Sequence, residues 1–272
     1  MQELDFFDSN IPCLAACPVN TNAGLYVAAI AEGDDEGAYL AARLPNPFAS
    51  VCARVCAAPC EDACRRGTLD APIAIRALKR FVTEKYGVEA GSASLVAQVA
   101  TAPSVKRPEN IGIVGGGPCG LAAAHDLAKL GYQVTIYEAT DILGGMMVMG
   151  IPEYRLPRDL VAAEIQTIID MGVEVQFDTQ LGVNANLAEI RERHDAVLVA
   201  IGATLGRGLD LEGHEADGVL RAIEYLINAN RGFAVDIGER VVVIGGGDVA
   251  MDAARTALRT EAYEAKADTQ DT

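Results

Sequence analysis

The chain has 272 residues, half of them apolar, and a formal net charge of −16. This is enough sequence for about two domains with buried cores. The acidic balance argues against nucleic acid and anionic membranes, which bind basic surfaces. Its simplest interpretation is a solvated acidic surface, and the alternative is an acidic docking face for a partner.

The sequence also bears on location. No stretch reaches about 18 consecutive apolar residues, so no membrane span is expected. The first nine residues carry acidic side chains and neither a basic cluster nor an apolar core, unlike a secretory signal. We therefore expect a cytoplasmic protein, in which cysteines are metal ligands or redox groups before they are disulfides.

Residues 1–87 are expected to form a small helical domain. Helix-favouring runs occur at 28–30 and 38–42. Residues 73–86 place apolar side chains at helical spacing with basic ones between them, which predicts an amphipathic helix closed by Gly87.

After a predicted linker at 88–109, which mixes small residues with two prolines, the pattern changes to alternating strands and helices. The predicted strands are 111–114, 134–137, 173–177, 196–201 (fully buried) and 240–244. The predicted helices are 118–130, 158–171 and 248–259. This alternation indicates an α/β region, in which crossover helices connect the strands of a parallel sheet.

The cysteines of the first region follow a regular spacing. They are Cys13, Cys17, Cys52, Cys56, Cys60 and Cys64, two and then four cysteines at Cys-x3-Cys steps. Thiolates are the ligands of iron–sulfur clusters, usually four per [4Fe–4S]. Pro59 argues against one continuous helix, so a loop that wraps a cluster is expected. Structural zinc, usually bound by closer C-x2-C pairs, and buried free thiols are the alternatives.

A dinucleotide-binding fingerprint follows the linker. Gly115, Gly117 and Gly120 form G-x-G-x-x-G between a predicted strand and a helix that begins at Pro118. These glycines permit the tight turn, the approach of backbone to a pyrophosphate and close helix–strand packing, and the helix N-terminus attracts phosphate. Glu138 ends the next strand, where a carboxylate accepts hydrogen bonds from ribose hydroxyls. Cys119, inside the motif, is interpreted as a packing residue rather than a redox thiol.

Further residues are predicted to line the nucleotide. Gly144 and Gly145 follow Glu138 closely, and Gly202 ends the strand at 196–201. The loop 150–157 (GIPEYRLP) contains Arg155, and its two interpretations are an ordinary connector and a loop lining a flavin.

A second copy of the βα opening occurs near the end of the chain. Gly245, Gly247 and Ala250 form G-x-G-x-x-A, a tolerated variant of the fingerprint. The next strand of such a unit, whose end distinguishes NADH from NADPH, does not follow. We expect that the chain is a fragment, that another chain completes the unit, or that FAD is bound without NAD(P)H.

Taken together, these motifs resemble the glutamate synthase small-subunit family over residues 11–259. The matching stretches are ACPVN at 16–20, NPFASVCARVCAAPCEDACRRG at 46–67, PIAIRALKRF at 72–81, GGGPCGLAAA at 115–124, GGMM at 144–147, GIPEYRLP at 150–157 and GGGDVAMDAARTALR at 245–259. The family includes the N-terminal half of dihydropyrimidine dehydrogenase and the large subunit of bifurcating NADH-dependent ferredoxin:NADP oxidoreductases.

The resemblance implies a fold of α and α/β parts. A helical [4Fe–4S] head at 1–87 and the linker at 88–109 precede a Rossmann-like FAD domain at 110–238, and 239–272 open an incomplete NAD(P)H domain. Electrons are expected to move between NAD(P)H, FAD, the cluster and a partner, either another oxidoreductase subunit or a ferredoxin-like carrier. The cofactors carry this chemistry, and no catalytic acid or base is nominated.

The resemblance also implies how the thiols divide. It groups Cys17, Cys56 and Cys60 in one cluster, with Cys52 as an available fourth ligand, and matches Cys13 and Cys64 to a second. Two-cluster relatives carry eight ligand positions, so six cysteines favour one cluster, and a second needs non-cysteine ligands.

Three functions remain open at this stage. The first is an FAD and iron–sulfur electron-transfer subunit of an NAD(P)H-linked oxidoreductase. The second is a non-catalytic assembly or relay subunit that holds FAD and the cluster without nicotinamide chemistry. The third, a disulfide reductase, is disfavoured because Cys119 is the single cysteine of the nucleotide motif.

Overall fold

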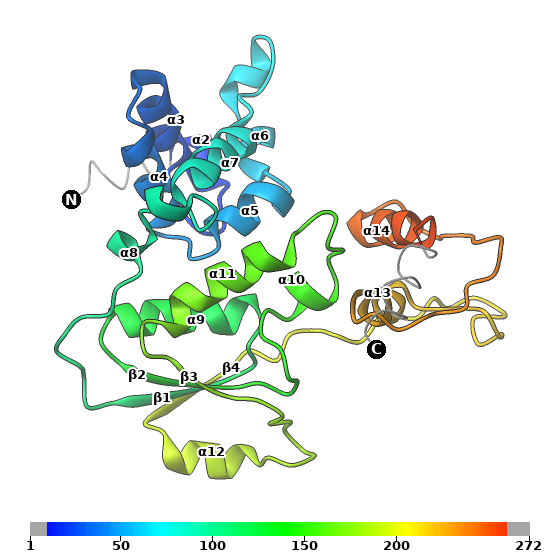
Figure 1. Ribbon diagram of the computed structural model, residues 1–272. Coiled ribbons are helices and arrows are strands. Elements are labelled where there is room, and N and C mark those ends of the chain that lie inside the picture. Colours follow the sequence, from blue (N-terminus) through cyan, green and yellow to red (C-terminus); the bar gives the residue numbers. More distant parts are fainter. Residues whose placement is uncertain (1–9, 260–272) are drawn as a thin grey trace.

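The computed structural model describes residues 10–259. Figure 1 shows a helical head, a four-stranded sheet below it, and a pair of helices to one side. The head contains α2 (Pro12–Ala15), α3 (Ala23–Glu32), α4 (Asp35–Arg43), α5 (Ala49–Val55), α6 (Pro59–Asp62), the 3-10 helix η1 (Arg65–Thr68) and α7 (Ile75–Tyr86).

Local signals explain where the head helices begin and end. The side chain of Asn22 accepts a hydrogen bond from the Leu25 N–H at 3.0 Å and caps α3, while Gly33 ends that helix at φ 83°. Pro59 starts α6 after Ala58, which has φ 56°. The cysteine-rich stretch is therefore split into two short helices, as the proline predicts.

The core of the head forms where α3, α4 and α7 meet. Its fully buried members include Tyr26, Tyr39, Ala42 and Val82. The amphipathic helix predicted at 73–86 is confirmed as α7, and Gly87 is its C-cap.

The segment predicted as a linker is more ordered than its composition indicates. It contains the 3-10 helix η2 (Gly91–Ala93) and α8 (Val96–Val99). Val96 and Val99 are buried, and Val96 joins the core of the head. Apolar packing thus fixes this segment against the head although its composition is typical of a connector.

The sheet confirms the predicted α/β class. Its strands are β1 (Asn110–Val114), β2 (Gln133–Tyr137), β3 (Glu174–Gln176) and β4 (Ala196–Val199), all parallel, in the order β3-β2-β1-β4. In register, Ile111 of β1 pairs with Val134 of β2 and with Ala196 of β4. The helices α9 (Pro118–Lys129) and α11 (Arg158–Ile169) cover the face toward the head, and α12 (Leu187–Arg193) lies on the opposite side (Figure 1).

The head and the sheet share one hydrophobic core. Phe48 and Val51 from the head pack with sheet and helix residues such as Ile113, Leu121 and Leu160. Helix α5, which carries Cys52, therefore packs directly on α11. This contact sets the position of the cysteine-rich head relative to the nucleotide motif.

Two predicted strands differ in the structure. The strand at 196–201 was expected to be buried, but β4 ends at Val199, which is half-exposed, and Ile201 is exposed. β4 is an edge strand, so one of its sides is uncovered by residues 10–259. Residues 240–244 form no strand, because no strand of the described chain pairs with them, and Val242 is 87% exposed.

The remaining helices of the described chain are α10 (Met146–Met149), α13 (Ala222–Asn230) and α14 (Asp248–Ala257). The sequence predicted α14, but it predicted none of α10, α12 and α13. α13 and α14 lie side by side, and Tyr225, Leu226 and Ala253 form a small core between them. Within residues 10–259, no helix is long and apolar enough to cross a membrane.

Candidate functional site: two glycine loops and a thiol cluster

The first glycine loop turns directly from β1 into α9. Gly115 has φ 111°, and a Cβ there would lie 2.3 Å from the carbonyl oxygen of Ala200. A Cβ on Gly120 would lie 1.9 Å from the Gly115 oxygen, so only glycine lets the helix approach the turn. Gly117 is the N-cap of α9, Pro118 is its first residue, and a Cβ on Gly117 would meet nothing closer than 3.9 Å. The helix N-terminus therefore faces open space, as phosphate binding requires.

Glu138 lies against this loop. Its side chain is buried and accepts a 2.7 Å hydrogen bond from the Gly116 N–H. Its other oxygen accepts from the N–H and the hydroxyl of Thr140, at 2.9 and 2.8 Å. These bonds hold the carboxylate at the carboxyl end of β2, where ligands of open α/β sheets bind. Thr140 was not predicted, although it stands only two residues after Glu138.

Two more predicted glycines meet the same loop. The Gly144 N–H donates to the carbonyl of Gly116 at 2.8 Å, and Gly144 and Gly145 both have positive φ. A Cβ on Gly145 would lie 3.0 Å from the Gly117 Cα. The turn at Gly144–Gly145 and the first glycine loop therefore contact each other directly through backbone atoms.

Gly202 and Arg155, the last two residues of this predicted group, have different surroundings. Gly202 follows β4 with φ 69°, two residues after Ala200, whose carbonyl abuts Gly115. Arg155 forms a 2.5 Å ion pair with Asp252 of α14. The hydroxyl of Tyr154 donates to the Asp252 carbonyl at 3.5 Å. The loop 150–157 thus attaches α14 to the first nucleotide unit.

The second glycine loop makes the same turn but has fewer neighbouring atoms. Gly245 has φ 126°, a Cβ on it would lie 3.4 Å from the Ala250 side chain, and Gly247 is the N-cap of α14. A Cβ on Gly246 or Gly247 would meet nothing within 4 Å. Since 240–244 are unpaired, this loop is anchored to the described chain through α14 alone.

Four thiols of the head act electrostatically on a buried tyrosine. Burial, followed by the charges of Cys60, Cys17, Cys13 and Cys56, raises the pKa of Tyr26. Cys13 lies in α2, Cys60 lies in α6, and these two helices contact each other. The Ala58 N–H donates to the Cys56 sulfur at 3.3 Å, and Arg76 binds the Cys56 carbonyl. Backbone N–H donors near thiolates are typical of iron–sulfur sites.

The other two head cysteines have different surroundings. Burial raises the pKa of Cys52, whose sulfur also interacts with Asn46. Hydrogen bonds from the backbone, that of Ile73 first, lower the pKa of Cys64 at the start of η1. The charges of Cys13, Cys17, Cys56 and Cys60 thus act on one tyrosine, and the predicted grouping of Cys13 with Cys64 stays a prediction. The exposed Cys119 lies at the start of α9, and Cys119 and all six head cysteines are free thiols.

The donor set fits an iron–sulfur cluster better than a single ion. Residues 10–259 contain no group of three or more His, Cys, Asp or Glu side chains gathered tightly enough for one metal ion. Zinc holds its sulfurs at about 2.3 Å, so it requires such a tight group. Thiols from α2, α6 and the segment between α5 and α6, with a backbone N–H donor at Cys56, match the soft ligand set of a [4Fe–4S] cluster.

A buried polar network joins the head to the sheet domain, and no sequence motif indicated it. Glu164 of α11 accepts hydrogen bonds from the N–H groups of Ser50 and Val51 at 2.8 and 3.1 Å, at the start of α5. Arg43 is 1% exposed, and its Nη1 lies 3.5 Å from the Nε2 of His125. Burial raises the pKa of Glu164 and lowers that of His125. The charged groups are thus tied to the helix that carries Cys52.

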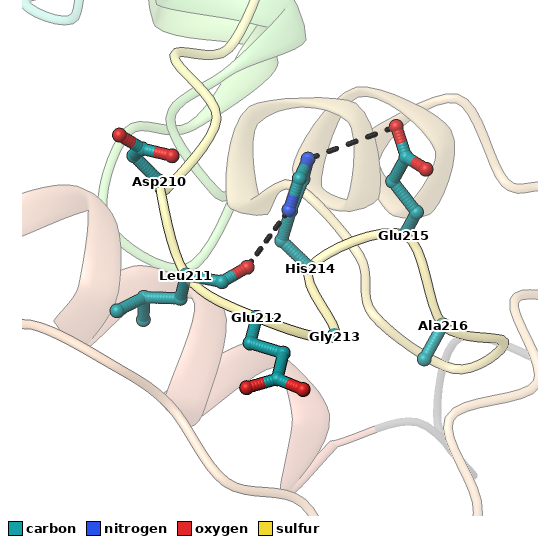
Figure 2. Close-up of a pocket in the computed structure, with 7 residues that line it drawn as sticks. All are labelled: Asp210, Leu211, Glu212, Gly213, His214, Glu215 and Ala216. Atoms are coloured by element: carbon teal, nitrogen blue, oxygen red, sulfur yellow. Dashed lines mark hydrogen bonds and ion pairs between the residues drawn. The ribbon is translucent and has the colours of Figure 1, made fainter.

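A hollow of about 450 Å³ lies elsewhere, in the loop 210–216 (Figure 2). One loop alone lines it, and Figure 2 shows His214 between the Leu211 carbonyl, 2.8 Å from its Nδ1, and Glu215. None of the predicted site residues lines this hollow.

Comparison with known proteins agrees with these two sites. Residues 8–90 match the family described as dihydropyrimidine dehydrogenase domain II, 4Fe-4S cluster. Residues 96–266 match the pyridine nucleotide-disulphide oxidoreductase family. The fold and the glycine loop define a dinucleotide-binding oxidoreductase with an iron–sulfur head.

Curated relatives align with most of the chain. The chain is 38% identical to the NADP(+)-dependent formate dehydrogenase subunit beta of Moorella thermoacetica, over 93% of this chain and 38% of the relative. It is 37% identical to the NAD-dependent dihydropyrimidine dehydrogenase subunit PreT of Salmonella typhimurium, over 90% and 58%. It is 33% identical to the glutamate synthase [NADPH] small chain of Azospirillum brasilense, over 93% and 55%. The chain thus spans roughly 40–60% of the length of these relatives.

A solved structure shares the fold. The Mycobacterium tuberculosis protein FprA in complex with NADPH superposes with a TM-score of 0.50 at 28% identity, over 55% of this chain and 36% of that one. The chain belongs to the pyridine nucleotide-disulphide oxidoreductase family, and the resemblance to glutamate synthase small subunits is confirmed. The predicted cofactors, FAD and [4Fe–4S], are those of its two matched domains.

Proposed function

We propose that this chain is the FAD- and iron–sulfur-carrying electron-transfer subunit of an NAD(P)H-linked oxidoreductase. One observation carries the proposal: the cysteine-rich head, through α5, shares a hydrophobic core with the glycine-loop domain. A head packed in this way keeps a cluster at a fixed distance from a nucleotide bound at the loop. When bound, FAD exchanges hydride with a nicotinamide nucleotide and single electrons with the cluster.

The residues of the chain bind and orient the cofactors. The open N-terminus of α9 at Gly117 supplies N–H groups and positive dipole to the pyrophosphate. Glu138, held by Gly116 and Thr140, offers its carboxylate to the ribose. Gly144, Gly145 and Gly202 leave room beside the loop, and their positive φ angles make other residues costly.

For the metal site, we propose one [4Fe–4S] cluster held by Cys13, Cys17, Cys56 and Cys60. These are the four thiols whose charges act on Tyr26, whereas Cys52 interacts with Asn46 and Cys56, and Cys64 interacts with the backbone of Ile73. About four iron atoms per chain are expected from iron and sulfide analysis of anaerobically purified protein, and eight would contradict the assignment.

We propose domain limits at 1–87, 110–238 and 239–272.

The partner and the location follow from the same chemistry. The formate dehydrogenase, dihydropyrimidine dehydrogenase and glutamate synthase relatives are named as subunits or chains of larger enzymes. We propose an oxidoreductase subunit or a ferredoxin-like carrier as partner. A reducing cytoplasm suits seven free thiols.

The direct test is anaerobic reduction of the bound flavin. The purified chain is titrated with NADH and with NADPH while the flavin absorbance near 450 nm is followed, roughly where oxidised flavins absorb. Dithionite then gives the fully reduced reference. Bleaching by either nucleotide supports the proposal, and a flavin that only dithionite bleaches contradicts its nicotinamide half.

A second function is favoured by the state of the second glycine loop. Residues 240–244 pair with no strand of the described chain, so the loop from Gly245 lacks the sheet that holds the first loop. A relay or assembly subunit that holds FAD and the cluster without nicotinamide chemistry of its own accounts for this. The same titration separates the two, because the relay subunit is reduced by dithionite or by its partner but not by NAD(P)H.

A further inference from the structure

The buried face of α7 carries a lysine where an apolar residue is expected. Ile75 and Val82 are 2% and 0% exposed, and Lys79, on the same helical stripe, is 9% exposed. Arg76 and Arg80 of the same helix are exposed. Lysines are almost never buried unless they are paired, so a partner for this ammonium group is required.

No carboxylate supplies that partner. Among residues 10–259, no Asp or Glu lies within ion-pair distance of the Lys79 ammonium group. Its Nζ instead lies 5.8 Å from the centre of the ring of Tyr26, on which the charges of the four thiols act. Its positive charge acts on Cys52 and Cys60. The ammonium group therefore lies beside Tyr26 and acts on Cys60, one of the four proposed ligands.

The sign of the charge has a consequence for redox chemistry. A [4Fe–4S] cluster with four thiolates is anionic and gains one more negative charge on reduction. A fixed positive charge close to a cluster stabilises the reduced form more than the oxidised form. Net charge and burial are among the levers that set cluster potentials.

We propose that Lys79 is the buried counter-charge of the cluster site, which faces the cluster from α7 and raises its reduction potential. The inference rests on the proposed occupancy of the head by a [4Fe–4S] cluster. Lys79 ligates nothing in this account; it acts through space on a cluster held by cysteines.

The test is a redox titration of the cluster in the whole chain, monitored by electron paramagnetic resonance, with iron and sulfide analysis. Lys79→Met removes the charge and keeps the length of the side chain, whereas Lys79→Arg keeps the charge. Arg80→Met is the matched control, because it removes a positive charge one residue away from an exposed position paired with Glu84. Lys79→Met is expected to lower the one-electron reduction equilibrium at least tenfold, about 59 mV. Lys79→Arg and Arg80→Met are expected to stay near the wild-type value.

Each outcome bears on the inference. A Lys79→Met cluster with the wild-type potential, or an equal shift in Arg80→Met, overturns it. Loss of the cluster from Lys79→Met alone, with retention in Lys79→Arg, supports a role for the charge, whereas loss from both variants shows a packing role and overturns it. A wild-type chain that binds no iron after anaerobic reconstitution overturns the proposed function itself, a result distinct from an unchanged potential.

Discussion

The two glycine loops have the same spacing and different surroundings. The loop from Gly115 leaves a paired strand, contacts the turn at Gly144–Gly145 and holds the Glu138 carboxylate. The loop from Gly245 makes the same positive-φ turn into α14, but the residues before it pair with no strand within 10–259. The fingerprint therefore encodes the turn and the helix start, and strand pairing supplies the rest of a nucleotide site.

The largest expected difference between the loops is in tolerance of a side chain. Gly120→Val places atoms within 1.9 Å of the Gly115 carbonyl, and we expect a loss of more than about 4 kcal/mol in the free energy of unfolding. Gly246→Val enters open space and should cost less than about 1 kcal/mol. Urea unfolding of both variants measures the difference, and equal losses would contradict the comparison.

The sequence predicted the first region better than the second for a physical reason. The β1 turn, α9 and Glu138 follow from local rules: glycine for the turn, an N-terminal proline, and the strand end. The strand at 240–244 and the burial of β4 depend on neighbouring strands, which local sequence does not specify.

In the thiol site, too, some features follow from local sequence and others depend on contacts between distant segments. Spacing indicated the cysteines, but the contact of α2 with α6, which brings the segments of Cys13 and Cys60 together, carried no sequence signal. Tyr26 and Glu164 carried no local signal. Lys79 did, because it interrupts the apolar stripe of the helix predicted at 73–86.

The second expected effect concerns the attachment of the first region to the head. Glu164→Ala removes a buried carboxylate that accepts from the Ser50 and Val51 N–H groups and faces Arg43. We expect a loss of about 3 kcal/mol, because two buried N–H groups lose their acceptor and the buried guanidinium loses a nearby negative charge. Asp70→Asn, which weakens the exposed ion pair of Asp70 with Arg66, is the control and should change unfolding by about 0.5 kcal/mol or less.

A smaller effect is expected where the second region is attached. Arg155→Met leaves the buried Asp252 carboxylate without its ion-pair partner. We expect hydrogen exchange in α14 to accelerate by the equivalent of about 2 kcal/mol while exchange in α9 is unchanged. Uniform acceleration in both helices would show that the two regions unfold as one unit.

The smallest expected effect is a pH dependence of the free energy of unfolding, which arises from His125 of α9. Burial holds the pKa of His125 below its ordinary 6.5, so the unfolded chain takes up this proton first as pH falls. Stability is expected to fall below pH 6.5, by at most about 1.4 kcal/mol per pH unit for one proton. His125→Gln should remove this component of the slope, and an identical pH profile in the variant would refute the assignment.

Flavin content in a matched pair of variants tests the central claim most directly. Gly117 and Gly247 are both helix N-caps with extended backbone, and a Cβ on either meets nothing closer than 3.9 Å. Valine at either position should therefore leave the fold intact, as circular dichroism can verify. If FAD binds the first loop, Gly117→Val loses the flavin and Gly247→Val retains it at about one per chain. Retention in Gly117→Val, or equal loss from both variants, would contradict the account.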